Sequence, residues 1–196
     1  MRAKDEKKDW AIRETALQMI VKEGFKGLSM QKLAKKANVS PGTIYIYYKD
    51  RNDLLNKLYI EVIDRTHKAV LIRFNPEMEF SKGLKLLWLN RYRHYIKYPN
   101  DFYFSEQFIN SPLIKSLKEK EDQAYRKQME EFYNNAVGNG EIPKLALEVY
   151  WTIAFAPLYH LIKFNLQEVI YPLPHLHVSE KKLLVTLELV LKALKK

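Results

Sequence analysis

Apolar side chains recur at intervals of three and four residues along most of the chain, which is the pattern of amphipathic helices. Within residues 9–22, Ile12, Ala16 and Ile20 fall on one side of such a helix, and Gly24 is expected to end it. Further long helices are expected over residues 51–74, 81–98, 99–109, 112–137, 143–168 and 179–195. With two short helices between the first and second of these, the pattern predicts an all-α fold of about nine helices.

The stretch from Ser29 to Leu55 holds two very short helices, a tight turn and the start of a third helix. Ser29 is suited to cap the first, because its hydroxyl accepts from free N–H groups of the first turn. Ser40 followed by Pro41 opens the second, since proline is favoured at the first helical position. Helices this short do not persist alone, so they must pack on their neighbours. The combination predicts a helix-turn-helix DNA-binding motif.

In such a motif the second helix enters the major groove with its N-terminal residues first. The residues expected near base edges or the nearest phosphates are Ser40, Pro41, Gly42, Thr43 and Ile46. The hydroxyls of Tyr45 and Tyr47 are expected to reach phosphates, and Gln31, at the start of the first short helix, a phosphate or a base. Lys49 and Arg51 place charge beside the free N–H groups of the following helix, an arrangement suited to an oxyanion.

Two residues of the second short helix and its end, Ile44 and Tyr48, are expected to lie in the core rather than on DNA. For Tyr45, packing and phosphate contact stay equally reasonable. The neighbouring Lys32, Lys35 and Lys36 can contact the DNA backbone, but a solvated helix face is the expectation for them.

Several segments around this motif also carry a family resemblance. They are Gly24-Phe25-Lys26-Gly27-Leu28-Ser29, Leu33-Ala34-Lys35-Lys36-Ala37, Val39-Ser40, Gly42-Thr43-Ile44-Tyr45, Tyr47-Tyr48-Lys49 and Leu54-Leu55. Together they resemble the N-terminal domain of the tetracycline-repressor (TetR) family of bacterial transcription regulators. Tyr48, Arg51 and Gln31 stand where that family usually has Phe, Lys and Thr.

The resemblance implies a DNA-binding domain over residues 1–50 with a connecting helix over 51–74, and an effector-binding and dimerisation domain over 75–196. Asn75-Pro76 breaks the helical pattern between the two. No Gly/Ser-rich linker is present there, so a helix-to-helix joint is expected.

Charge is unevenly distributed along the 196 residues, whose formal net charge is +10. Residues 1–51 hold 12 Lys and Arg against 6 Asp and Glu, which favours a phosphate-facing N-terminal region. Ordinary solvated lysines remain the alternative explanation.

Other features of the sequence exclude several classes of function. The chain has no Cys, hence no disulfide and no thiol nucleophile, and no Gly-rich phosphate loop or HExxH motif. It also lacks a signal-peptide core and a long apolar run. We therefore expect a cytoplasmic protein without membrane contact, cofactor or metal, and not an enzyme.

Aromatic side chains are dense in the rest of the chain, where a helical bundle can enclose a small lipophilic or aromatic effector. The candidate ligand-binding residues are Trp88, Tyr92, Tyr95, Phe104, Gln107, Phe108, Glu121, Tyr125, Gln128, Trp151 and Phe155. Aromatic stripes at helical spacing are also ordinary core, so packing stays an alternative for each. Pro157 is expected to kink its helix.

The last helix carries an apolar stripe formed by Leu183, Leu187, Val190 and Leu194. The resemblance implies that the last two helices pair with their symmetry mates in a four-helix bundle, which makes this stripe and Tyr159 the candidate dimer interface. The alternative is that the stripe closes the core of the monomer.

These observations predict a homodimeric DNA-binding regulator, a repressor released from a palindromic double-stranded operator by a small, largely apolar effector. The alternative is a ligand-independent oligomeric or architectural DNA-binding protein.

Overall fold

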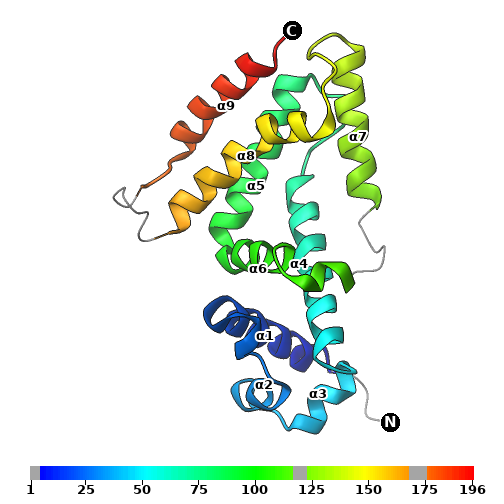
Figure 1. Cartoon of the computed structure of the whole chain (residues 1–196), viewed down its shortest axis with the longest axis vertical. Coiled ribbons are helices and arrows are strands. Elements are labelled where there is room, and N and C mark those ends of the chain that lie inside the picture. The colour runs from blue at the N-terminus through cyan, green and yellow to red at the C-terminus, as the bar shows by residue number, and fades with distance from the viewer. Residues whose placement is uncertain (1–4, 117–122, 168–175) are drawn as a thin grey trace. The chain divides into compact units, whose positions relative to one another are not determined.

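The computed structural model describes residues 5–116, 123–167 and 176–196, and these form nine α-helices, one short 3-10 helix and no strand (Figure 1). The helices are α1 (Glu6–Gly27), α2 (Met30–Lys36), α3 (Pro41–Tyr47), α4 (Arg51–Val70), α5 (Phe80–Lys97), α6 (Pro99–Ile109), η1 (Pro112–Ser116), α7 (Gln123–Gly138), α8 (Leu147–Leu166) and α9 (Glu180–Leu194). The predicted all-α fold is confirmed.

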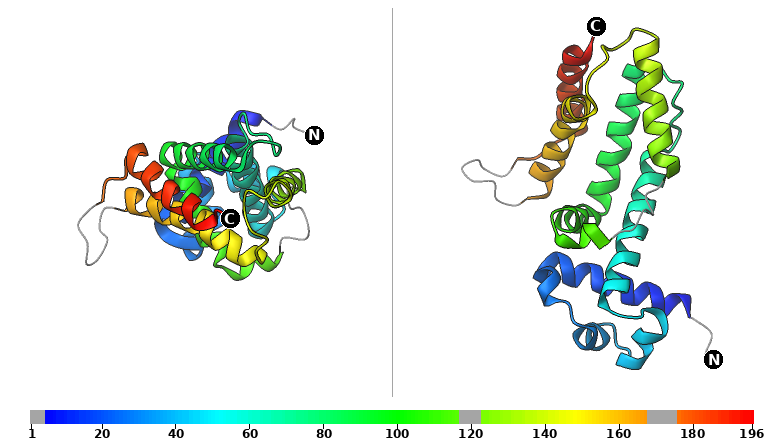
Figure 2. Two further views of the ribbon diagram at one scale, coloured as in Figure 1. Left: turned by 90° about the horizontal axis from the view of Figure 1, so that it is seen from above. Right: turned by 45° about the vertical axis from the view of Figure 1, so that its right-hand side comes forward.

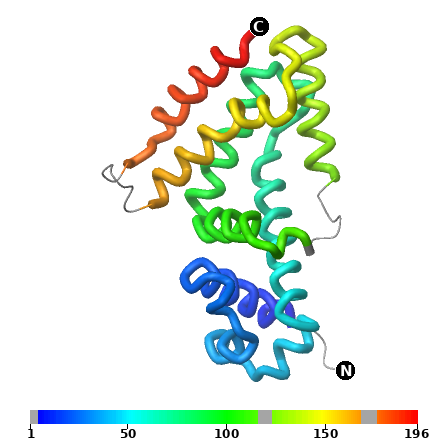
Figure 3. Tube along the Cα trace, in the orientation of Figure 1, coloured from blue at the N-terminus to red at the C-terminus, as the bar shows by residue number. Residues whose placement is uncertain are grey.

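The chain forms two compact units, which Figure 3 traces along the backbone. The N-terminal unit consists of residues 1–65 and 100–120, and the C-terminal unit of residues 66–99 and 121–196. Helix α6 and η1 therefore belong with the three N-terminal helices, although the chain reaches them only after α5. The sequence-based division at residue 75 assigned them to the second domain.

Helix ends in the N-terminal unit follow from local sequence. The Ser29 hydroxyl accepts from the Lys32 N–H at 3.2 Å, and the Ser40 hydroxyl from the Thr43 N–H at 3.2 Å, so both predicted caps are present. Gly24 adopts a φ of 69°, which favours glycine, and it breaks α1 without ending it at that residue.

The core of the N-terminal unit joins all its helices. Its fully buried members come from α1, α2, α3, α4 and α6, and those of the first four helices include Ile12, Leu33, Ile44, Leu55 and Leu58.

Helix α6 closes this core with aromatic rings. Phe108 stacks on Tyr59 with ring centroids 4.1 Å apart, and Phe25 meets the edges of both Phe104 and Phe108. Edge-to-face and offset arrangements of this kind are the favoured aromatic geometries. Burial of these rings explains why α6 packs with helices distant in sequence.

The C-terminal unit is built on α5, α8 and α9, of which α8 and α9 run side by side in Figures 1 and 2. The Trp88 indole N–H donates to the Ala154 carbonyl at 2.8 Å and thereby joins α5 to α8. Pro157 lies inside α8, which continues across it. None of the helices within the described ranges is long and apolar enough to cross a membrane.

Candidate nucleic-acid interface

Helix α3 has a buried side and an outward side. Ile44 and Tyr48 are fully buried, as the sequence predicted, and Tyr47 is buried beside them. On the other side Pro41 and Gly42 are exposed, Tyr45 is 55% exposed and Ile46 is 45% exposed. Because Tyr45 and Ile46 are adjacent and both exposed, this outward side is the candidate contact surface.

Gly42 lies at the start of the outward side of α3. A Cβ added there would meet only the Ser40 hydroxyl, at 3.9 Å, so the chain's own packing leaves room for a side chain. Glycine in a helix lowers stability relative to alanine. The absence of a side chain at this surface position favours close approach by another molecule.

The hydroxyls that begin α3 are paired with each other. The Ser40 oxygen lies 2.8 Å from the Thr43 oxygen while it caps the helix. Thr43 is half-buried and Ser40 exposed. Both hydroxyls border the outward side of α3, where each retains capacity for a further hydrogen bond.

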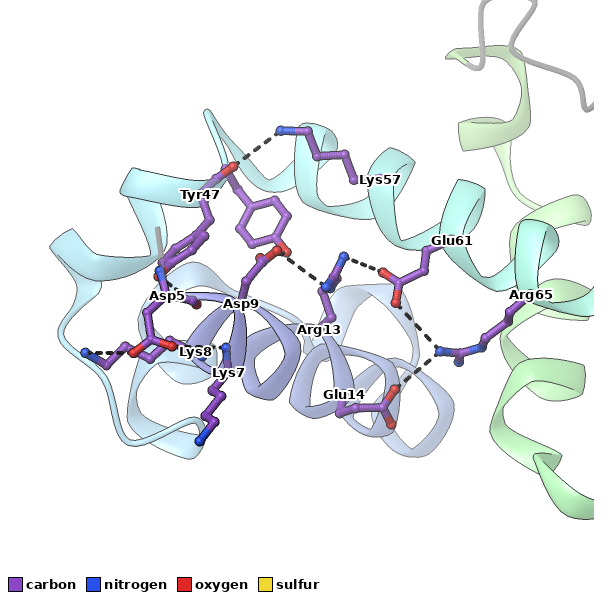
Figure 4. Close-up of polar contacts among 11 residues, drawn as sticks. Asp5, Lys7, Lys8, Asp9, Arg13, Glu14, Tyr47, Lys57, Glu61 and Arg65 are labelled. Atoms are coloured by element: carbon purple, nitrogen blue, oxygen red, sulfur yellow. Dashed lines mark hydrogen bonds and ion pairs between the residues drawn. The ribbon is translucent and has the colours of Figure 1, made fainter. Parts of the chain in front are cut away.

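Tyr47 uses its hydroxyl within the chain. It donates to the Asp5 carbonyl at 3.1 Å and accepts from the Asp5 N–H at 2.9 Å, which fastens the start of α1 to α3. The predicted phosphate contact of Tyr47 therefore has a competing intramolecular role. The start of α1 that this contact fixes to α3 also carries the exposed Lys7 and Lys8, two cations that the sequence reasoning did not single out (Figure 4).

Arg51 also has partners within the chain. Its guanidinium donates to the Leu28 carbonyl at 3.0 Å and to the Phe25 carbonyl, so it holds the end of α1 against the start of α4. This occupies the charge that was expected to face phosphate.

The start of α4 carries its own carboxylates. Asp50 accepts from the Asp53 N–H at 2.8 Å, and Asp53 accepts from the Lys49 N–H at 2.9 Å. The oxyanion site expected there is thus filled by Asp50. The Lys49 side chain remains exposed and is the better placed of the two predicted cations.

A network of charged side chains begins at Tyr48, the residue that ends α3 (Figure 4). The Tyr48 hydroxyl donates to Asp9 at 2.5 Å, and Arg13 lies 3.4 Å from Asp9 and 2.7 Å from Glu61. Burial, and then the bond to Asp9, raise the pKa of the Tyr48 phenol. Burial likewise raises the pKa of Glu61, against the lowering effect of Arg13.

The same network of charged side chains continues to α6. Arg65 lies 3.5 Å from Glu14 and 3.9 Å from Glu61, and its Nε donates to Asp101 at 2.7 Å. Its Nη2 donates to the second Asp101 oxygen, so the pair is bidentate. The Asp101 side chain is only 1% exposed and the Arg65 side chain 30%, so the ion pair is buried on its carboxylate side.

Helix α2 presents polar side chains outward. Gln31, Lys32 and Lys35 are exposed, and Lys36 pairs with Glu23 of α1. Gln31 is thus accessible, as its predicted contact requires. Among the described residues no cluster of His, Asp and Glu is arranged to hold a metal ion.

The predicted effector residues are divided between the two units. Most of them belong to the C-terminal unit: Trp88, Tyr92, Tyr95, Tyr125, Gln128, Trp151 and Phe155. These side chains are buried except for Trp151, which is exposed, and Gln128, which is half-buried. Phe104, Gln107 and Phe108 lie in the N-terminal unit, where the two rings are core and the Gln107 amide donates to the Val21 carbonyl at 3.4 Å. Glu121 falls outside the described residues.

The predicted dimer residues are not the exposed residues of α8 and α9. Leu183, Leu187, Val190 and Leu194 are buried within the C-terminal unit, and Tyr159 is half-buried. The apolar residues that point outward on the same two helices are Val185, Leu189 and Trp151. The stripe closes the core of this unit, and any symmetric contact of α8 and α9 must use the outward residues.

Arg91 is a further residue that the sequence reasoning passed over. It continues the buried stripe formed by Leu84, Leu87 and Trp88 on α5, and it is itself buried. A charge at a core position of an amphipathic helix is a signal that the sequence contains. The exposure of Val185 and Leu189 was readable too, because both are out of phase with the buried stripe of α9.

Comparison with known proteins agrees with this arrangement. Residues 12–58 match the family model for bacterial regulatory proteins of the tetR family. The chain is 29% identical over 99 residues to an uncharacterised HTH-type transcriptional regulator of Haemophilus influenzae, a match covering 50% of this chain and 53% of that protein. The match thus spans about half the length of this curated relative.

Solved structures resemble the whole chain. A TetR family transcription regulator from Marinobacter aquaeolei VT8 has the same fold, with a TM-score of 0.77, 24% identity and coverage of 100% of both chains. A putative TetR family transcriptional regulator from Vibrio parahaemolyticus gives a TM-score of 0.75 and 26% identity, with coverage of 96% of this chain and 99% of that one.

Proposed function

Because the chain belongs to the tetR family of bacterial regulatory proteins, we propose that it is a dimeric transcription regulator that inserts α3 into the major groove of a palindromic operator. The family consists of regulators, in agreement with the expectation that the chain is not an enzyme. The observation that carries the proposal is the outward side of α3, where Gly42, Tyr45, Ile46 and the adjacent Lys49 are exposed while the opposite side is buried.

Binding to DNA divides between these residues. Ile46 offers an apolar surface for a thymine methyl group, and Gly42 allows the backbone close to the duplex. Tyr45 and Lys49 suit phosphates, with Ser40, Thr43 and Gln31 as further polar contacts. Ile46 therefore contributes sequence discrimination, and Lys49 contributes affinity that depends on salt.

Selection from a random duplex library tests this division. We expect an inverted repeat with half-sites about 34 Å apart. Ile46→Ala should cost about 1 kcal/mol on the selected site and relax its sequence preference. Ile109→Ala, which truncates an equally exposed isoleucine on α6, is the control and should bind as the wild type does.

Salt dependence tests the charged contact separately. Lys49→Met should weaken binding to all sequences and reduce the slope of log K against log salt by about one unit. Lys85→Met, at an exposed position of α5, should leave the slope unchanged. An unchanged slope for Lys49→Met would remove the phosphate role.

We assign dimerisation to the outward residues of α8 and α9, since one recognition helix reads only a half-site. Leu189 is 61% exposed, and Val185 and Trp151 are also exposed, whereas the buried stripe of Leu183, Leu187, Val190 and Leu194 holds α9 in place. Paired with a second copy, these surfaces form the four-helix contact that the sequence predicted.

Sedimentation measurements test this assignment. Leu189→Glu should give folded monomers with weak operator binding, because a charge at the centre of an apolar interface has no partner there. Ile72→Glu, at an equally exposed isoleucine outside α8 and α9, should leave the dimer intact. A Leu189→Glu protein that still dimerises and binds the operator would contradict the assignment.

The remaining part of the proposal is release of DNA by a small, largely apolar effector bound in the C-terminal unit. The aromatic side chains of α5, α7 and α8 support it, since they supply an apolar environment with a few polar groups. A ligand-independent architectural protein is the competing function. Retention of operator affinity in the presence of every compound that raises the melting temperature would favour that competitor.

A further inference from the structure

Arg91 of α5 is a buried cation whose described neighbours are mainly aromatic. It is 2% exposed, and its Nη2 donates to the Tyr125 hydroxyl. The guanidinium carbon lies 5.2 Å from the ring centroid of Phe155 and 5.7 Å from that of Tyr159. Its Nη1 atom has no hydrogen-bond acceptor within the part of the chain that the structure describes.

A guanidinium stays protonated under all ordinary conditions, so the charge of Arg91 cannot be relieved by loss of a proton. Rings and a neutral hydroxyl attract it only weakly, and a buried charge needs a negative partner to offset its lost hydration. Other arginines of the chain have such partners: Arg65 has Asp101, Arg13 has Glu61, and Arg93 has Glu180. Among the described residues Arg91 has no such anion, which points to a partner from outside the chain.

We propose that Arg91 binds the oxyanion head of the effector, and that this effector is an amphipathic carboxylate with an apolar or aromatic body. The proposal rests on the ligand-regulated function argued above and names its ligand class. The planar guanidinium matches a carboxylate through two parallel hydrogen bonds, for which Nη1 is available. Phe155, with Trp151 at 4.5 Å between ring centroids, supplies apolar surface next to the charge.

The same site has a contact with the helix that leads to the DNA-binding motif. The ring of Tyr125, whose hydroxyl accepts from Arg91, stacks on His67 with centroids 3.7 Å apart and planes 4° apart. His67 lies in the last turn of α4, and Arg51 at the first turn of α4 holds the carbonyls of Phe25 and Leu28. A carboxylate on Arg91 competes with the Tyr125 hydroxyl, and α4 is the element through which this change reaches α3.

Matched pairs of ligands test the head group. The full chain is titrated with octanoate, dodecanoate and 2-naphthoate, each beside the alcohol that has the same apolar body, and both the melting temperature and Kd are measured. We expect at least one carboxylate to raise the melting temperature, and to bind about 10- to 100-fold more tightly than its alcohol. Neutral alcohols that bind as well as the carboxylates, or carboxylates that all fail to bind, would overturn the proposal.

Variants of two neighbouring arginines test the residue. Arg91→Met should lose most of the preference for the carboxylate, and Arg91→Lys, which keeps the charge and covers failure of the first variant to fold, should retain part of it. Arg93→Met, which removes an exposed arginine paired with Glu180, is the control and should bind as the wild type does. Carboxylate affinity that survives in Arg91→Met, together with a lower melting temperature without ligand, would mean that the role of Arg91 is structural only.

Operator binding is measured on the same samples, so that the two proposals can fail separately. Carboxylate binding through Arg91 with no effect on operator affinity would contradict ligand regulation and leave the anion site standing. Release of the operator by a neutral compound, with no carboxylate bound, would contradict the anion site and leave the regulator standing.

Discussion

The two units treat their buried charges differently. In the N-terminal unit Arg65 and Asp101 form a bidentate pair, and Arg13 lies between Asp9 and Glu61. Each of these arginines thus contacts a carboxylate, in a network that extends from α1 to α6. In the C-terminal unit Arg91 lies among rings and a hydroxyl. Contact between opposite charges favours one arrangement, whereas a charge without an anionic partner favours a ligand that supplies one. The N-terminal unit thus pairs its charges within the chain, whereas Arg91 leaves a charge in the C-terminal unit that a ligand of the proposed class would offset.

Phe104→Ala should produce the largest loss of stability among these variants, and it tests whether α6 is part of the N-terminal unit. The ring is fully buried against Phe25 and Tyr59, so its loss should lower the free energy of unfolding by about 3–5 kcal/mol. Hydrogen exchange should rise in α1 and in the first turns of α4 while α8 and α9 keep their protection. Ile109→Ala, at an exposed site five residues further along α6, should change little. Faster exchange confined to α8 and α9 would place Phe104 with the effector residues instead.

Asp101→Asn removes one partner of the buried pair and leaves the Arg65 charge without its main anion. We expect a loss of about 2–4 kcal/mol in the free energy of unfolding, at the lower side of buried pairs because the Arg65 side chain is 30% exposed. Glu23→Gln removes the solvent-exposed pair with Lys36 and should change stability much less in the same urea titration. Equal effects for the two variants would mean that burial of charge does not distinguish this unit.

Tyr48→Phe removes only the hydroxyl that joins the end of α3 to Asp9. The half-buried Asp9 carboxylate loses a hydrogen bond, so the variant should be less stable by about 1–2 kcal/mol near neutral pH. The pKa of Tyr48 is raised in the folded state, so its contribution is complete below the unfolded value of about 10 and is lost as the pH rises above it. The stability difference between wild type and variant should therefore shrink above that pH. A difference independent of pH would contradict the raised pKa of Tyr48 in the folded state.

Much of the N-terminal unit was predictable because its signals are local. Ser29 and Ser40 cap their helices, and Ile44 and Tyr48 are buried, as spacing and turn chemistry indicated. The partners of Tyr47 and Arg51 were not predictable, since Asp5 and Phe25 are 42 and 26 residues away in sequence. Periodicity identifies a side chain's face, but it does not identify the element that covers that face.

The same reason explains the outcome for the second half of the chain. The sequence pattern correctly found the apolar stripe of α9, yet a stripe suits the monomer core as well as a dimer, and Leu187 is buried within its own unit. Likewise Phe104 and Phe108 were recognised as apolar positions of a helix, and only the path of the chain assigns them to the N-terminal unit. The lack of an anionic partner for Arg91 among the described residues was not predictable, because no local rule states whether a charge on a buried stripe will contact an opposite charge.

Gly42→Ala produces the smallest expected change in stability and separates the inside of a unit from its outer surface. The added methyl has open space, so the variant should gain about 0.5 kcal/mol in the free energy of unfolding while operator affinity falls, because the methyl lies where the duplex approaches. The matched control is Gly83→Ala on α5, where a Cβ would lie 2.5 Å from the Phe132 ring and should cost about 1–3 kcal/mol through overpacking. Gly83 is remote from α3 in sequence and belongs to the other unit, so folded Gly83→Ala protein should keep its operator affinity. Stability that rises with unchanged DNA binding in Gly42→Ala would remove the close approach of the duplex at this glycine, and with it the main support for the outward side of α3 as the reading surface.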